Sequence, residues 1–127
     1  MRRWTGPRIV AVIIGLVFVV SGIWAMSNPM SFYTNVATYP PYNEHLWHDI
    51  GAFQIGLGAT LLFTFFWTDA PLVALAGVGV GSVLHFVAHV IDRGQGGKST
   101  DPLSIGLVAA VVAAAALWRA AQLRRGR

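Results

Sequence analysis

Four long apolar stretches limit what this chain can fold into. They cover residues 9–26, 45–67, 71–92 and 103–123. Each is close to the roughly 20 residues that a helix needs to cross a hydrocarbon core of about 30 Å. With 55% hydrophobic and 11% charged residues, the chain is too apolar for an ordinary soluble domain of 127 residues. The pattern predicts an all-α membrane protein, a four-transmembrane-helix antiparallel bundle forming a single membrane domain over residues 1–127.

The breaks between these stretches carry helix start and stop signals. Asp101 stands before Pro102, which places a capping side chain ahead of a proline at the first helical position. Asp69 and Pro71 form a similar signal for the third stretch. Residues 94–97, with the sequence GQGG, make a polar and flexible turn that has no place in lipid. These signals place the helix ends at the two membrane surfaces.

The basic residues predict the orientation. Seven of the nine either precede the first apolar stretch or lie at the end of the last: Arg2, Arg3, Arg8, Arg119, Arg124, Arg125 and Arg127. Lysine and arginine concentrate on the cytoplasmic side of membrane proteins, so both termini are expected in the cytoplasm and the protein in the plasma membrane. The tryptophans fit this orientation, because Trp67 and Trp118 fall at the inner surface and Trp24 and Trp47 at the outer one. Charge gathered at the chain ends does not indicate nucleic-acid binding.

The first apolar stretch has one alternative interpretation. Arg2 and Arg3 before an apolar run, followed by Ala25-Met26-Ser27, also fit a secretory signal with a cleavage site. The run is long for the apolar region of a signal, and Trp24 lies close to the cut. We therefore favour a retained helix.

Histidines and aspartates gather at the outer ends of the second and third predicted helices. One set is spaced i, i+3, i+4 and the other i, i+4, i+7, so each shares one helical face. The sets are His45, His48 and Asp49, and His85, His89 and Asp92. Antiparallel neighbours joined by a short turn would bring both faces to the same level. These six residues are the predicted metal site, with a donor set that suits zinc, copper or iron.

Three alternatives to a transition-metal site stay open for this cluster. One histidine from each of two helices can hold a single b-type haem. The same side chains can form a pocket that handles protons or binds a ligand. Histidines near a membrane surface also form purely structural hydrogen bonds. The chain has no cysteine, so disulfides and thiolate ligands are excluded.

Other features predict packing. Gln54 is expected to bond a neighbouring helix, with a quinone or ligand contact as the alternative. Gly77 with Gly81, and Gly56 with Thr60, form pairs of small residues that usually mark close helix packing and only sometimes an oligomer interface. The aromatic and proline-rich segment 27–43 is expected as an outer loop, which either anchors at the membrane surface or covers the histidine cluster.

Two stretches resemble the DoxX-like family of small membrane proteins. The run RIVAVIIGLVFVVSGIW at residues 8–24, leading to Asn28-Pro29, is similar to their first helix, and GAFQIGLGATLL at residues 51–62 resembles their second. The resemblance, which extends to related uncharacterised bacterial four-helix families, implies a four-helix bundle in the cytoplasmic membrane and an association with redox or sulfur-oxidising systems. The absence of cysteine departs from thiol chemistry, and the histidine cluster is not implied by the resemblance.

The sequence thus predicts a metal-binding protein or redox-accessory subunit of a membrane complex. A small transporter for protons or a solute, and a structural assembly subunit without a cofactor, are the alternatives. The expected partners are the lipid bilayer and either other subunits or further copies of this chain, with no nucleic acid. A stand-alone enzyme is not favoured, because no nucleophile and base, and no phosphate-binding loop, can be recognised.

Overall fold

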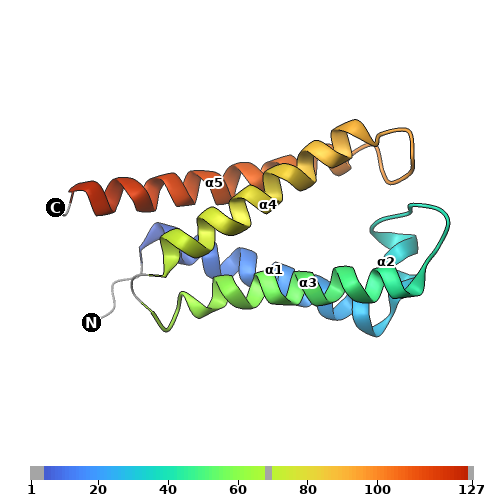
Figure 1. Ribbon diagram of the computed structural model, residues 1–127, viewed down its shortest axis with the longest axis horizontal. Coiled ribbons are helices and arrows are strands. Elements are labelled where there is room, and N and C mark those ends of the chain that lie inside the picture. Colours follow the sequence, from blue (N-terminus) through green and yellow to red (C-terminus); the bar gives the residue numbers. More distant parts are fainter. Residues whose placement is uncertain (1–4, 68–69, 126–127) are drawn as a thin grey trace.

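The computed structural model describes residues 5–67 and 70–125, and that part of the chain forms five helices and no strand (Figure 1). The helices are α1 (Gly6–Ser27), α2 (Pro29–Asn35), α3 (Glu44–Phe63), α4 (Pro71–Ile91) and α5 (Asp101–Arg125). The prediction of an all-α chain is confirmed. The prediction of four helices is wrong, because a fifth helix occupies the segment that we expected to be a loop.

Three of the described helices, α1, α4 and α5, are long and apolar enough to cross a membrane. This makes the chain a membrane protein, but the four-transmembrane-helix prediction is wrong. With 20 residues, α3 is long enough, but it is too polar. Its first two turns carry Glu44, His45, His48 and Asp49.

The unexpected helix α2 forms directly after α1. Pro29 occupies its first turn, and the Asn28 carboxamide oxygen accepts a hydrogen bond from the Ser31 backbone N–H at 3.2 Å. Proline is well suited to a first helical turn, and asparagine is a favoured capping residue. Phe32 anchors the helix, because its ring lies buried against Trp47, with 5.7 Å between ring centroids. Trp47 is therefore a core residue, with 4% of its surface exposed, and not the interfacial anchor that we expected.

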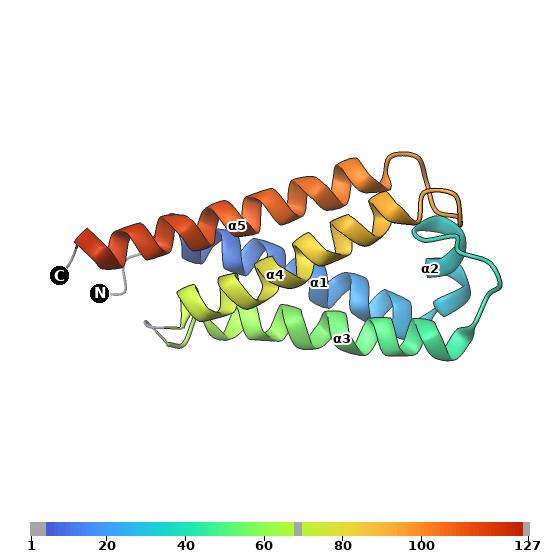
Figure 2. The same ribbon diagram turned by 45° about the horizontal axis from the view of Figure 1, so that its top comes forward.

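The long helices are arranged as two hairpins. α3 runs back along α1, and α5 runs back along α4, so α1 begins and α5 ends at the same end of the molecule (Figures 1 and 2). The hairpins meet in a core of small and branched side chains from α1, α3, α4 and α5: Ala11, Leu61, Ala74, Leu75, Val78, Val112 and Ala115. At the opposite end, α4 and α3 lie apart in both views (Figures 1 and 2).

Glycines set the close contact between α1 and α3. A Cβ atom built on Gly22 would lie 2.7 Å from the Gly51 carbonyl oxygen, and one on Gly58 would lie 2.6 Å from the Gly15 carbonyl oxygen. Neither distance is tolerated by real side chains, so the two backbones touch at two levels seven residues apart. Between these levels, the Ser21 hydroxyl donates to the Gln54 side-chain oxygen at 2.6 Å. This confirms that Gln54 bonds a neighbouring helix.

The predicted pairs of small residues behave differently. A Cβ atom on Gly56, Gly77 or Gly81 would meet no other atom within 4 Å. These glycines therefore do not mark contacts between helices of this chain. The expectation of close packing at these positions is wrong within the described structure.

The turn between the two hairpins also differs from the prediction. α3 ends at Phe63, four residues earlier than the expected end at residue 67, and the buried Thr64 hydroxyl donates to the Leu61 carbonyl oxygen at 2.7 Å. α4 begins at Pro71, as expected. The predicted capping residue Asp69 lies outside the described residues.

Candidate functional site

A histidine pair stands near the C-terminal end of α4. His85 and His89 are one helical turn apart, and their Nε2 atoms approach to 3.0 Å. His89 is half-buried, and His85 is exposed at the surface of this chain. An ionisable side chain in a membrane helix needs a polar partner, because lipid offers none. Each ring supplies that partner to the other.

The second nitrogen of His89 is bonded to a tyrosine from the segment between α2 and α3. The Tyr39 hydroxyl lies 3.0 Å from His89 Nδ1, and the two rings pack edge to face. Tyr39, His89 and His85 therefore form one continuous series of hydrogen bonds. The series links the loop end of the molecule to a position two turns inside α4.

The loop after α4 holds Tyr39 in place. The Gly97 backbone N–H donates to the Thr38 carbonyl oxygen at 2.8 Å, and the Lys98 ammonium donates to the Asn35 carbonyl oxygen. Gly97 has a φ of 76°, in the left-handed region that favours glycine. A Cβ atom at this position would also lie 2.6 Å from the Tyr39 hydroxyl oxygen. Only glycine fits between the tyrosine and the loop.

The environment of Tyr39 keeps its hydroxyl protonated. Burial raises the pKa of the phenol above its ordinary value of 10.0, and the negative charges of Asp101 and Asp92 raise this pKa further. At neutral pH the side chain is therefore a phenol, which can either donate a hydrogen bond to His89 Nδ1 or accept one from it.

Asp92 does not join the histidine pair. Its Oδ1 accepts a hydrogen bond from the Gln95 side chain at 2.9 Å. Asp101, at the start of α5, accepts a hydrogen bond from the Lys98 backbone N–H at 2.7 Å. Both carboxylates thus bond groups of the connecting loop and help to fold it.

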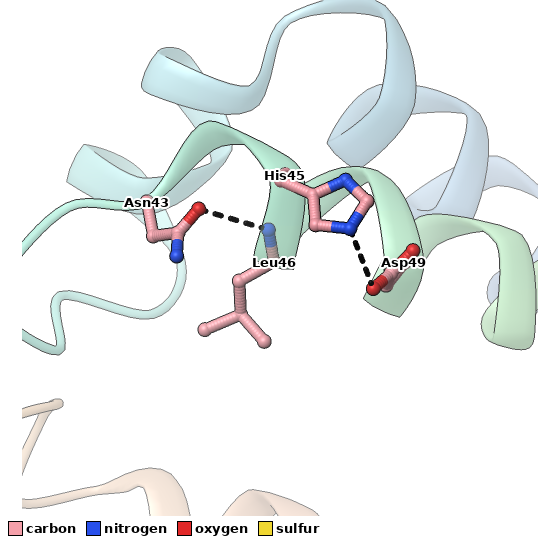
Figure 3. Close-up of polar contacts among 4 residues, drawn as sticks. All are labelled: Asn43, His45, Leu46 and Asp49. Atoms are coloured by element: carbon pink, nitrogen blue, oxygen red, sulfur yellow. Dashed lines mark hydrogen bonds and ion pairs between the residues drawn. The ribbon is translucent and has the colours of Figure 1, made fainter.

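The second predicted set lies at the start of α3, where Figure 3 shows His45 and Asp49. His45 Nε2 is 3.5 Å from Asp49 Oδ2, and both side chains are largely exposed, at 84% and 57%. The Asn43 side-chain oxygen caps this helix by accepting a hydrogen bond from the Leu46 backbone N–H at 3.3 Å (Figure 3). His48 is half-buried and has no hydrogen-bond partner among the described residues.

The structure does not bring the two predicted sets into one cluster. Within the described ranges, no three histidine, aspartate or glutamate side chains are grouped so that they could hold a metal ion. The reason is the choice of packing partner. α3 lies along α1 and α4 along α5, so the polar ends of α3 and α4 are not neighbours (Figures 1 and 2).

An open cleft of about 500 Å³ lies next to the histidine pair. Five polar side chains line it: Tyr39, His89, Arg93, Lys98 and Ser99. The backbone of Gly96 and Gly97 and the ring of Pro102 complete the lining. The cleft is thus built from the segment before α3, the end of α4 and the loop that leads into α5.

Sequence reasoning found the histidines of this site but missed its other side chains. Tyr39 belongs to the segment that we expected either to cover the histidines or to anchor at the membrane surface, and its contact with His89 agrees with the first of these. Arg93 and Lys98 are the two basic residues that do not belong to the seven at the chain ends. No signal in the sequence indicated that they face the same cleft as His89.

Neither a protein-family model nor a curated protein nor a solved structure matches this chain.

Proposed function

We propose that this chain is a membrane protein that takes up and releases a proton at the His85–His89 pair while it handles a small polar solute. The hydrogen-bonded series Tyr39–His89–His85 carries this proposal. It runs from an open polar cleft into a helix that is apolar enough to span a membrane.

The distance between the two Nε2 atoms defines what the pair can do. At 3.0 Å, two nitrogen lone pairs cannot face each other without a cation between them. In the neutral pair, one ring donates its N–H to the other. Adding one proton keeps this contact as a charge-assisted hydrogen bond, whereas a second would set two N–H donors face to face. While the two rings stay in contact, the pair can therefore hold one additional proton.

Tyr39 connects the pair to the cleft in two ways. When its O–H donates to His89 Nδ1, the other nitrogen of His89 carries the hydrogen and donates to His85. When His85 donates instead, His89 carries its hydrogen on Nδ1 and donates to the Tyr39 oxygen. The two arrangements run in opposite directions along the same three groups. Such a series suits proton exchange between the cleft and the interior of α4.

Metal binding is a second candidate, and the convergence of the two Nε2 atoms favours it. Histidines spaced i, i+4 on a helix can bind zinc, copper or iron, and the contact from Tyr39 to His89 Nδ1 is the kind that orients a metal-bound imidazole. This chain would supply two ligands from its described residues, so a redox or Lewis-acid centre would need further ligands from a partner subunit or solvent. The role of an accessory subunit would agree with the resemblance of two stretches to the DoxX-like family.

We further propose that the cleft faces the outside of the cytoplasmic membrane. The opposite end carries the basic residues Arg8 of α1 and Arg119, Arg124 and Arg125 of α5. The positive-inside rule then places the start of α1 and the end of α5 in the cytoplasm.

Histidine ring titration by nitrogen NMR, in lipid nanodiscs, tests the proposed proton chemistry. His85→Gln should change the titration of His89, because the partner that shares its proton is lost. His45→Gln is the matched control, since it removes an exposed histidine paired only with Asp49. A His89 titration that is unchanged by His85→Gln would overturn the proposal. Stoichiometric metal in the wild type, lost in both His85→Gln and His89→Gln, would instead establish the second candidate.

A further inference from the structure

Two basic side chains line the cleft beside His89. Arg93 and Lys98 both line it, and in the described part of the chain neither lies within ion-pair distance of a carboxylate. The Arg93 guanidinium has no hydrogen-bond partner there, and the Lys98 ammonium donates only to a backbone carbonyl, that of Asn35. Two cations are thus left with unused donors at one site.

The nearby acidic residues act on Tyr39, but among the described side chains neither forms an ion pair with Arg93 or Lys98. Asp92 and Asp101 are absent from the cleft lining. Asp92 Oδ1 accepts from Gln95, and Asp101 Oδ2 accepts from the Lys98 backbone N–H. Each carboxylate therefore already serves the folding of the loop, while the two basic side chains remain directed to the lining of the cleft.

The remaining polar groups of the lining are donors of the kind that oxyanions need. Ser99 contributes a hydroxyl, and Tyr39 can donate its O–H when it accepts the hydrogen bond of His89. Arginine binds phosphate oxygens through two parallel N–H donors, and lysine adds a compact charge. The backbone contact from Gly97 to Thr38 fixes the wall that carries Lys98 and Ser99 next to the wall that carries Tyr39.

We propose that this cleft binds a phosphate-type oxyanion through Arg93, Lys98 and Ser99, next to the proton-exchanging histidine. The anion is either free in solution or part of an anionic lipid head group, because both present the same oxygens and the cleft lies at the end of a membrane-spanning helix. This assignment names the solute class of the function proposed above and rests on it, since His89 belongs to both.

Phosphate binding to the full chain in nanodiscs of phosphatidylcholine tests the assignment. Inorganic phosphate is titrated calorimetrically against the wild type, Arg93→Gln, Lys98→Gln and the control Arg124→Gln, which removes an exposed arginine at the far end of α5. We expect each cleft variant to lose about tenfold or more in affinity, as the loss of a charge-assisted hydrogen bond predicts. Arg124→Gln should bind as the wild type does.

A second arm distinguishes the two sources of the oxyanion. Nanodiscs that contain phosphatidylglycerol are compared by native mass spectrometry, which counts retained lipids. Retention that falls in Arg93→Gln and Lys98→Gln, without binding of inorganic phosphate, assigns the cleft to a lipid head group. Binding of phosphate without lipid retention assigns it to a free anion. Equal binding by the wild type and the Arg93→Gln, Lys98→Gln double variant in both arms would overturn the assignment.

Helix content and thermal unfolding are measured for each variant, and Arg93→Lys serves as a conservative version that keeps the charge. His85→Gln separates the two proposals, because it breaks the histidine pair and leaves the cleft lining intact. Phosphate binding that persists in His85→Gln supports the cleft independently of proton exchange. A wild-type chain in which His85 and His89 share a proton but no oxyanion binds would refute the proposed oxyanion site. The proposed proton function would not be affected.

Discussion

Tyr39 is the residue whose ionisation can be followed most directly. Its raised pKa means that folding favours the phenol over the phenolate. The contribution of this group to stability is therefore fully present below its ordinary pKa of 10.0 and is lost as the pH rises through the higher pKa of the folded state. Neutral and moderately alkaline solutions leave the contact with His89 intact.

An alkaline absorbance titration of the wild type and Tyr39→Phe checks this expectation. The difference between the two curves isolates the phenolate of Tyr39 from those of the other tyrosines. We expect the difference to appear at a higher pH than that of an ordinary tyrosine. A difference centred at or below pH 10.0 would contradict the environment described for Tyr39.

At this scale, the sequence predicted what lies within one helix but not what lies between helices. The i, i+4 spacing is sufficient to bring His85 and His89 together, because both belong to α4. The expected contact of this pair with His45 and His48 required α3 and α4 to be close neighbours at their polar ends. That depends on which helix each one packs against, and no spacing along the chain determines it.

Among the elements, α1 and α3 depend on glycine for their contact. Gly58→Leu would force a side chain into the backbone of α1, since even a Cβ atom would lie 2.6 Å from the Gly15 carbonyl oxygen. Overpacking of this kind costs on the order of 1–3 kcal/mol, so we expect a lower unfolding temperature in mild detergent. Thermal unfolding followed by circular dichroism measures the effect.

Gly56→Leu is the matched control for this change. Gly56 lies on the same helix, but a Cβ atom there would meet nothing within 4 Å. Leucine is also a better helix former than glycine, so the unfolding temperature of Gly56→Leu should equal or exceed that of the wild type. Equal losses of stability in both variants would contradict the described packing of α3 on α1.

The apolar runs predicted the long helices, but they did not predict the helix α2 or the polarity of α3. α2 lies in a segment rich in proline and aromatic residues that we interpreted as a loop. Its helix is nevertheless stabilised by the Asn28 cap and by the burial of Phe32. α3 looked like a span because its second half is apolar, whereas the charged and polar residues of its first two turns make the whole helix too polar.

At the scale of the whole molecule, the proposed orientation in the membrane can be tested with introduced cysteines. The natural chain has no cysteine, so a single introduced one reports its own side without background. Gly94→Cys lies exposed in the loop beside the cleft, and Ala121→Cys lies exposed near the end of α5. In intact cells, a maleimide that cannot cross membranes should label the first variant.

The second variant should react only after the cells are permeabilised. The reverse pattern would place the cleft in the cytoplasm and contradict the proposed orientation. It would leave the chemistry of the histidine pair unchanged, because that chemistry depends on the contacts within α4 and with Tyr39 and not on the side of the membrane.

The shared proton between His85 and His89 is the central claim, and it can be observed directly. In uniformly nitrogen-labelled protein in nanodiscs, treated with a chelator at neutral pH, a hydrogen bond between the two Nε2 atoms transmits a nitrogen–nitrogen coupling. We predict that coupling in the wild type and its absence in His85→Gln. Two histidine rings without mutual coupling, each exchanging its proton with water as a free imidazole does, would contradict the account.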